Sequence, residues 1–172
     1  RDLHPEFRTQ NSALRVIDVG AGAGFPAIPL KIVCPAWHLT LLEATRKKCD
    51  FLEHIIKTLP LADARVGWAR AETAGHAPSE REHYDLVVAR AVAELNVLVE
   101  YLLPFARVGG QVIAWKGDAI EDEVKAAKGA IGKLGGKLRA VRPVQVPGID
   151  QQHHLVIIDK VAPTVAAYPR RE

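Results

Sequence analysis

The sequence predicts a doubly wound α/β fold built on a mostly parallel, seven-stranded sheet that an antiparallel hairpin closes. Short apolar runs of strand length alternate with longer segments of helical periodicity, a pattern typical of parallel sheets with right-handed crossovers. The first apolar run ends in a glycine-rich turn, and the last two runs follow one another without a helical segment between them. Ligands of such sheets bind beyond the carboxyl ends of the strands, so we expect the functional residues there.

Seven segments have the length, apolar content and flanking turn residues of strands. They are residues 15–19, 39–43, 65–68, 84–89, 111–116, 138–146 and 154–160. The first five alternate with helical segments and are therefore expected to run parallel. The last two are expected to pair as the closing antiparallel hairpin.

Four segments have helical periodicity. Residues 26–33 begin with Pro26, which suits a first turn because that position needs no N–H donor. Residues 47–59 carry apolar side chains at i, i+3 and i+4 spacing, which predicts one buried face. The other two segments are residues 94–107, interrupted near Pro104, and residues 120–134.

Length and composition predict one domain over residues 1–172. The chain has 172 residues, of which 48% are hydrophobic and 25% charged, and this excludes a disordered, collagenous or coiled-coil protein. No apolar run reaches the roughly 20 residues of a membrane span. The absence of methionine indicates that residue 1 is not a translation start. With no visible signal peptide, Cys34 and Cys49 are expected to be reduced thiols of a cytoplasmic protein.

A glycine-rich turn directly follows the first predicted strand. Asp18 precedes three glycines at alternate positions, Gly20, Gly22 and Gly24, and Phe25 comes next. Glycines let a backbone approach a ligand closely, and the following helix presents its N–H groups to a polar or anionic group. This arrangement predicts a ligand site, with a tight turn that binds nothing as the alternative.

Two acidic residues follow later strands. Glu43 ends the second predicted strand, 19 residues beyond Gly24, where a carboxylate accepts hydrogen bonds from ribose hydroxyls. Glu72 follows the third strand, at the place where the amino group of a bound cofactor's adenine would lie. The glycine fingerprint of NAD-binding proteins would need a glycine at position 25. The Phe25 side chain found there would obstruct the pyrophosphate of a dinucleotide. The pattern therefore favours S-adenosylmethionine (SAM), which has no phosphate, over NAD.

Several longer motifs extend this pattern. DVGAGAGFPAIPLKI, TLLEATRKKCDFL, RAE, YDLVVARAVAEL, GGQVIAWKG, HLVIIDK and YPRR occur in this order. Together they resemble the RsmG (GidB) family of bacterial 16S rRNA guanine-N7 methyltransferases, from about Leu14 to Arg171. The resemblance implies a Rossmann-like, class I SAM-dependent methyltransferase fold. It also implies that the family's N-terminal helical segment and extreme C-terminal tail are missing here.

The resemblance further implies the reaction and its residues. SAM would be the methyl donor, S-adenosylhomocysteine (SAH) the product, and N7 of a guanine at position 527 of 16S rRNA the acceptor. The SAM contacts carried over by matching positions are Gly20, Phe25, Ala71, Glu72 and Arg90, with Glu43 for the ribose. Asp18, Gly22 and Gly24 complete the predicted cofactor site.

The acceptor chemistry is consistent with the absence of a catalytic dyad. Guanine N7 has an exposed lone pair and no proton, so an enzyme needs alignment of the reactants and no general base. Amine methylation calls for a D/N-P-P-Y/F loop where Val88-Ala89-Arg90-Ala91 stands. Arg90 and Lys116 are therefore predicted to act by positioning, although an ion pair of Arg90 with Glu72 or Glu94 is the structural alternative.

Basic residues border the predicted site, and the net charge is +3. The candidates for contacts with the RNA backbone are Arg46, Lys47, Lys48, Lys116, Arg170 and Arg171. Ordinary surface charge is the alternative for all of these except Lys116. The expected partner is 16S rRNA, in the small ribosomal subunit or an assembly intermediate, and we expect a monomer.

The sequence also fits other functions. The alternatives are a methyltransferase for another RNA or a small molecule, and a non-catalytic SAM- or RNA-binding module. No metal site is expected, because His153 and His154 lack acids or cysteines at ligand spacing. Trp37, Trp68 and Trp115 are expected in or near the core, and which aromatic ring stacks on the target base is not predicted.

Overall fold

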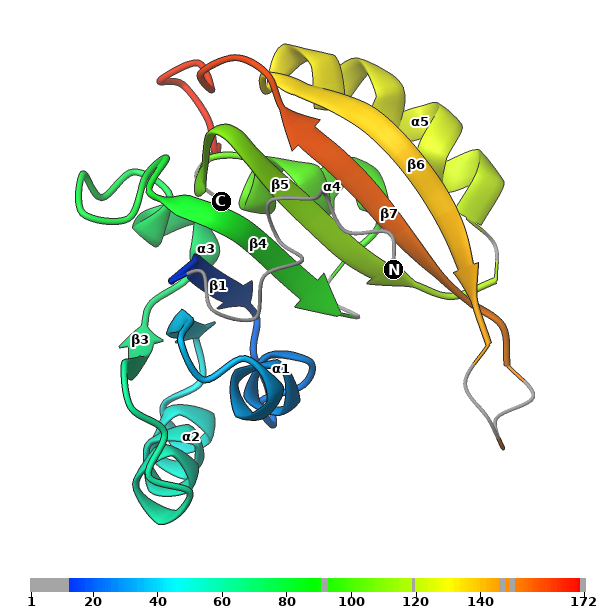
Figure 1. Cartoon of the computed structure of the whole chain (residues 1–172). Coiled ribbons are helices and arrows are strands. Elements are labelled where there is room, and N and C mark those ends of the chain that lie inside the picture. The colour runs from blue at the N-terminus through cyan, green and yellow to red at the C-terminus, as the bar shows by residue number, and fades with distance from the viewer. Residues whose placement is uncertain (1–12, 91–92, 119, 146–147, 149–150, 171–172) are drawn as a thin grey trace.

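One seven-stranded sheet organises the chain in the order β3-β2-β1-β4-β5-β7-β6 (Figure 1). The computed structural model describes residues 13–90, 93–118, 120–145, 148 and 151–170. The strands are β1 (Arg15–Val19), β2 (His38–Glu43), β3 (Ala64–Trp68), β4 (Tyr84–Arg90), β5 (Ala106–Lys116), β6 (Gly136–Val144) and β7 (His153–Lys160). The helices are α1 (Ala27–Val33), α2 (Arg46–Thr58), α3 (Ala71–Ala74), α4 (Leu95–Leu102) and α5 (Ile120–Lys133).

The strand pairing confirms the predicted topology. β1 pairs in parallel with both β2 and β4, β2 with β3, and β4 with β5. β7 pairs antiparallel with β5 and with β6, which is the closing hairpin. Because the chain order reverses between β1 and β4, their carboxyl ends form the switch point at which such sheets bind ligands.

Two apolar clusters pack against opposite faces of the sheet. On one face Val16, Leu41 and Val88 pack with residues of α1 and α2, including the fully buried Leu52. On the other face the strands pack with α4 and α5, around Phe105. Side chains alternate between the faces along a strand, so Asp18 and Arg90 share the α1–α2 face with Val16 and Val88.

The helix predicted for residues 94–107 is too long. α4 ends at Leu102, and β5 begins at Ala106, which pairs with Tyr84 of β4. Pro104 has no N–H to continue the helix. The one-turn helix α3 was not predicted at all, because four residues carry no periodicity.

The expectation that the tryptophans lie in or near the core is wrong for Trp68. Trp37 is 4% exposed, whereas Trp68, the last residue of the edge strand β3, is 59% exposed. Its indole N–H donates to the Ala44 carbonyl at 3.0 Å, and the Arg46 guanidinium lies 4.9 Å from the ring centroid.

None of the helices described here is long and apolar enough to cross a membrane.

Candidate active site

A cavity of about 430 Å³ lies at the carboxyl ends of β1, β2 and β3. Its lining includes four residues predicted for the cofactor, namely Gly20, Glu43, Ala71 and Glu72, together with Lys48 from the first turn of α2. Glu72 is 8% exposed and reaches the cavity from α3. The cavity therefore brings together side chains that lie more than fifty positions apart in the sequence.

The glycine turn has a backbone that requires glycine. Gly20, Gly22 and Gly24 have φ values of 75°, 57° and 89°. These values lie in the left-handed region, which residues other than glycine rarely adopt. The N–H groups of Gly20 and Ala21 donate to the Leu42 carbonyl at 2.9 and 3.0 Å. These bonds fix the turn against the end of β2, where Glu43 follows.

Substitution at Gly24 is expected to destabilise the fold far more than substitution at Gly22. A Cβ atom on Gly24 would lie 2.3 Å from Ile28 Cδ1 and 3.3 Å from Leu52 Cδ2. Gly24→Ala should cost about 2–4 kcal/mol, from overpacking and left-handed strain together. The control is Gly22→Ala, whose Cβ would meet nothing nearer than 3.8 Å and should cost about 1 kcal/mol. Equal losses in urea unfolding would contradict this assignment.

Glu43 is buried and held by backbone donors. Its Oε2 accepts the Gly22 N–H at 3.0 Å, and its Oε1 accepts the Thr45 N–H at 2.9 Å. Burial alone would raise the pKa of this carboxyl, but the N–H groups of Thr45 and Gly22, with Lys48 nearby, hold the pKa below its usual value. An ionised carboxylate with lone pairs left over is suited to accept hydrogen bonds from ribose hydroxyls.

Asp18 lies at the base of the turn without a hydrogen-bond partner. The residue is fully buried, and neither carboxylate oxygen is satisfied by any described residue. Burial raises its pKa to about 7, an effect that the nearby Ala27 N–H, which lies outside hydrogen-bond geometry, and the charge of Arg90 only partly offset. Two buried carboxylate oxygens without donors reduce the stability of the ligand-free protein. They suit a ligand that brings a cationic group or a hydrogen-bond donor.

Arg90 ends β4 beside Phe25. Phe25 is 53% exposed, and the Arg90 guanidinium lies 5.8 Å from its ring centroid. Among the described residues, the Arg90 guanidinium contacts this ring and forms no ion pair with the alternative partners Glu72 or Glu94. The guanidinium is exposed at the rim, where it can bind an anionic or carbonyl oxygen of a ligand.

Lys116 is bound within the protein. Its Nζ donates to the Ala93 carbonyl at 2.8 Å and pairs with Glu123 Oε2 at 2.7 Å, and its side chain is only 11% exposed. Glu123 also accepts the Leu95 N–H at 2.9 Å. Lys116 therefore joins the end of β5 to the starts of α4 and α5. The partner lies in the acidic first turn of α5, a cluster of acidic residues that is visible in the sequence.

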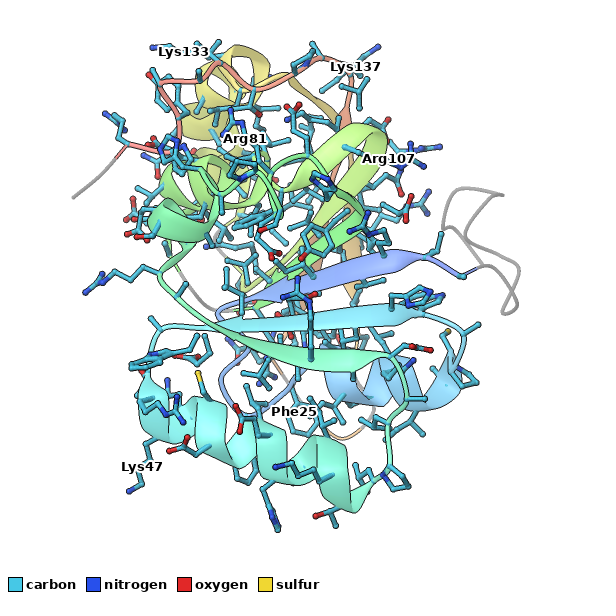
Figure 2. The ribbon with its side chains drawn as sticks, turned by 90° about the vertical axis from the view of Figure 1, so that its left-hand side faces the viewer. Phe25, Lys47, Arg81, Arg107, Lys133 and Lys137 are labelled. Carbon is cyan, nitrogen blue, oxygen red and sulfur yellow. The ribbon has the colours of Figure 1, made fainter. Side chains whose placement is uncertain are left out.

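The predicted RNA contacts lie in two places. Arg46, Lys47 and Lys48 begin α2 and are exposed; Arg46 also pairs with Asp50 at 2.9 Å. Figure 2 shows Lys47 pointing away from the sheet. Arg170, in the C-terminal tail, forms an ion pair with Glu100 at 2.8 Å while its side chain stays 73% exposed. Arg171 lies outside the described residues.

Two further residues of the site were not predicted. Thr45 supplies the second backbone donor to Glu43, and Tyr101 of α4 lines the cavity. The position of Thr45 two residues after a strand-ending acid is the only sequence signal for either.

Within the described part of the chain, no group of three or more His, Cys, Asp or Glu side chains is arranged to hold a metal ion.

Comparison with known proteins identifies relatives over most of the chain. A family model described as "GidB: rRNA small subunit methyltransferase G" matches residues 3–156. The ribosomal RNA small subunit methyltransferase G of Roseiflexus castenholzii is 56% identical over 156 residues, which cover 91% of this chain and 66% of that protein. The protein of the same name from Chloroflexus aggregans is 52% identical, with coverages of 94% and 67%. This chain thus spans about two thirds of the length of these relatives.

Solved structures confirm the predicted fold. A 16S rRNA (adenine(1408)-N(1))-methyltransferase from Catenulisporales acidiphilia, solved with SAM, superposes with a TM-score of 0.72 at 18% identity over 96% of this chain and 95% of that one. M. jannaschii TYW2, solved with AdoMet, gives a TM-score of 0.68 at 18% identity, with coverages of 88% and 71%. At this identity the likeness establishes a Rossmann-like methyltransferase fold alone.

Proposed function

Because this chain belongs to the GidB family of rRNA small subunit methyltransferases, we propose that it transfers a methyl group from SAM to N7 of a guanine, position 527, in 16S ribosomal RNA. The observation that carries the proposal is the cavity at the switch point, in which the buried, ionised Glu43 is held by the glycine turn. It supports a nucleoside cofactor without phosphate groups. The acceptor rests on membership of the family.

The residues around the cavity fit SAM group by group. Glu43 would accept hydrogen bonds from the ribose hydroxyls, and Ala71 with Glu72 would contact the adenine. The unsatisfied carboxylate of Asp18 supplies a negative charge for the cationic methionyl end. Gly20 leaves room for the ligand to approach the backbone, because it carries no Cβ.

The chain's task in this reaction is alignment. When bound, SAM would supply the methyl group on its sulfonium sulfur: guanine N7 would attack this carbon in line, so that the N7–C bond forms as the S–C bond breaks and SAH is the leaving group. No proton has to be removed, so no residue is needed as a general base. Arg90 would orient the base or the cofactor at the rim, and Lys116, through Ala93 and Glu123, holds the end of β5 in place as a positioning residue.

The proposed partner is 16S rRNA, in the small subunit or an assembly intermediate, met in the cytoplasm by a monomeric enzyme. The exposed basic turn Arg46–Lys48 lies beside the cofactor cavity, which supports contacts with the RNA backbone, and Arg170 and Arg171 would add contacts from the tail. For Lys116, an RNA contact would require the lysine to leave Glu123, so we assign it the positioning role instead.

Transfer of labelled methyl groups tests the reaction. The chain would be incubated with tritiated SAM and 16S rRNA or small subunits from a bacterial strain that lacks this methylation, and the RNA cleaved by borohydride and aniline at N7-methylguanine. We expect one cleavage site. Label without cleavage would assign another acceptor atom, and bound SAH without label would refute the proposed acceptor.

Salt dependence separates an RNA substrate from a small molecule. If Lys47 and Lys48 contact phosphates, Lys47→Ala and Lys48→Ala should each reduce the slope of log affinity against log salt by about 0.7 for single-stranded RNA. Lys57→Ala, at the other end of the same helix, is the matched control and should leave the slope unchanged. Equal slopes in all variants would favour the small-molecule alternative.

Arg90→Ala is expected to reduce methyl transfer at least about tenfold without loss of the fold, because the side chain is exposed. Removal of its charge should also raise the pKa of Asp18 further, since Arg90 now lowers it. Single-turnover kinetics and SAH affinity would separate transfer from binding. Arg139→Ala, which removes a guanidinium paired with Asp159 on the hairpin, is the control. Wild-type turnover of Arg90→Ala would disprove the role.

A further inference from the structure

A second cavity opens at the same edge of the sheet, farther along the strand order than the cofactor cavity. It has a volume of about 290 Å³ and is lined by Arg90, Trp115, Lys116, Gly117, Gln151 and His153. The ends of β4 and β5 and the start of β7 meet there (Figure 1). Arg90 ends the strand next to β1 and lines this second cavity, whereas the cofactor cavity lies at the ends of β1, β2 and β3.

Two aromatic rings form one wall of this cavity. The Trp115 and His153 ring centroids are 5.5 Å apart, with an angle of 59° between the ring planes. Both residues are half-buried, so part of their surface remains open to a ligand. Trp115 is the residue opposite Arg90 in the β4–β5 pairing, which places their side chains on the same face of the sheet.

We propose that this second cavity binds the target guanine, with the base stacked on Trp115 and flanked by His153. The inference rests on the proposed function and names the base-binding residues of that site. Unpaired bases in RNA are held by stacking on aromatic side chains. Methylation at N7 leaves a positively charged base, and the face of an indole ring attracts a cation. Arg90, which lines the same cavity, can donate to guanine O6.

The other exposed indole is less suited to this role. Trp68 also lies at the carboxyl edge, but the Arg46 guanidinium already stacks on its ring, and its N–H is bound to the Ala44 carbonyl. Trp37, the third tryptophan of the chain, is buried at 4% exposure. Trp115 is thus the indole that borders both Arg90 and an open cavity.

Fluorescence of the three tryptophans tests the base site without requiring turnover. 7-Methylguanosine 5′-monophosphate, GMP and AMP would each be titrated into the full chain in the presence of SAH. We expect quenching by the two guanine nucleotides in the wild type and in Trp68→Phe, and no quenching in Trp115→Phe. Equilibrium dialysis should find the guanine nucleotides bound about tenfold or more weakly by Trp115→Ala, but within about threefold of wild type by Trp115→Phe, which keeps an aromatic face.

The outcomes distinguish this inference from the proposed function. Quenching that persists in Trp115→Phe, or undiminished nucleotide affinity in Trp115→Ala, overturns the base site. With rRNA as substrate, Trp115→Ala and His153→Ala should raise KM while SAH affinity stays at the wild-type value. If the wild type transfers no methyl group to rRNA but binds 7-methylguanosine monophosphate through Trp115, the proposed function fails and the base site stands.

Discussion

Asp18→Asn is expected to make the cofactor-free protein more stable while weakening its binding of SAM and SAH at least about tenfold. The carboxylate is fully buried and has no hydrogen-bond partner among the described residues. The amide is nearly the same size but carries no charge, so it removes the cost of burying an anion. It also removes the negative charge that we assign to the cationic end of the cofactor.

The pH dependence of this effect has a defined sign. Burial raises the pKa of Asp18 from 3.8 to about 7. In the unfolded chain the carboxyl loses its proton near its ordinary pKa, whereas the native protein keeps the proton until about pH 7. The native state therefore loses stability, relative to the unfolded chain, as the pH rises from about 4 to 7, by up to about 4 kcal/mol. Above pH 7 the loss is complete and constant.

Urea unfolding between pH 4.5 and 8 checks this prediction. The stability difference between Asp18→Asn and the wild type should grow toward pH 7 and then level off. Asp122→Asn, at a carboxylate that is 96% exposed, should show no such trend. SAH affinity of the wild type should rise over the same range, as the carboxylate ionises, and stay flat in Asp18→Asn. A stability difference that does not change with pH would remove Asp18 as the source.

The sequence predicted those parts of the site that follow directly from strand ends. Asp18 and Glu43 are polar residues at the ends of two apolar strands, and the glycines between them permit the positive φ values of a tight turn. The predicted first strand, residues 15–19, coincides with β1, and the second begins one residue inside β2. Parallel pairing then brings both strand ends to the cofactor cavity, so the local sequence pattern was sufficient to predict the position of this part of the site.

The remaining features depend on contacts that local pattern does not contain. Lys116 was predicted to contact phosphate because a lysine in a strand would otherwise be buried, but the return of α5 brings Glu123 to it. That Asp18 lacks donors follows only from the packing above it. Trp68 is exposed because β3 is the edge strand, and strand order is a property of the whole sheet.

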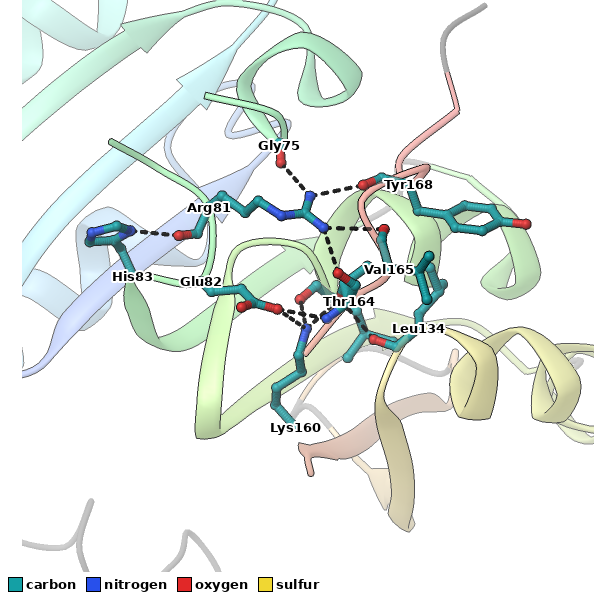
Figure 3. A network of polar contacts seen from close by, with 10 residues as sticks. Gly75, Arg81, Glu82, His83, Leu134, Lys160, Thr164, Val165 and Tyr168 are labelled. Carbon is teal, nitrogen blue, oxygen red and sulfur yellow. Dashed lines mark hydrogen bonds and ion pairs between the residues drawn. The ribbon is translucent and has the colours of Figure 1, made fainter. Parts of the chain in front are cut away.

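Arg81→Ala is expected to destabilise the protein by about 3–4 kcal/mol, because it leaves several carbonyl groups without a donor. Arg81 Nη1 donates to the carbonyls of Gly75 and Tyr168 at 2.8 Å each. Its Nη2 donates to those of Thr164 and Val165 at 2.7 and 3.2 Å. Figure 3 shows this one guanidinium joining the turn after α3 to the C-terminal tail, beside the ion pair of the buried Lys160 with the half-buried Glu82.

The same substitution should weaken SAH binding several-fold through α3. Ala71 and Glu72 of α3 line the cofactor cavity, and Gly75 follows this helix directly. His76 is within hydrogen-bond distance of the Pro169 carbonyl at 2.7 Å, so the tail packs against the segment for which we propose the adenine contacts. Loss of the Arg81 bonds should release the tail and with it the position of α3.

Two variants make the Arg81 prediction specific. Arg81→Lys keeps the charge but cannot form the forked set of bonds, so its stability loss should be intermediate. Arg139→Ala removes a single ion pair at 3.2 Å between partly exposed groups and should cost about 1 kcal/mol or less. Hydrogen exchange would follow the tail, and calorimetry the SAH affinity. Faster exchange of residues 161–170 with unchanged SAH affinity would mean that α3 keeps its shape without the tail, since the two measurements would then be uncoupled.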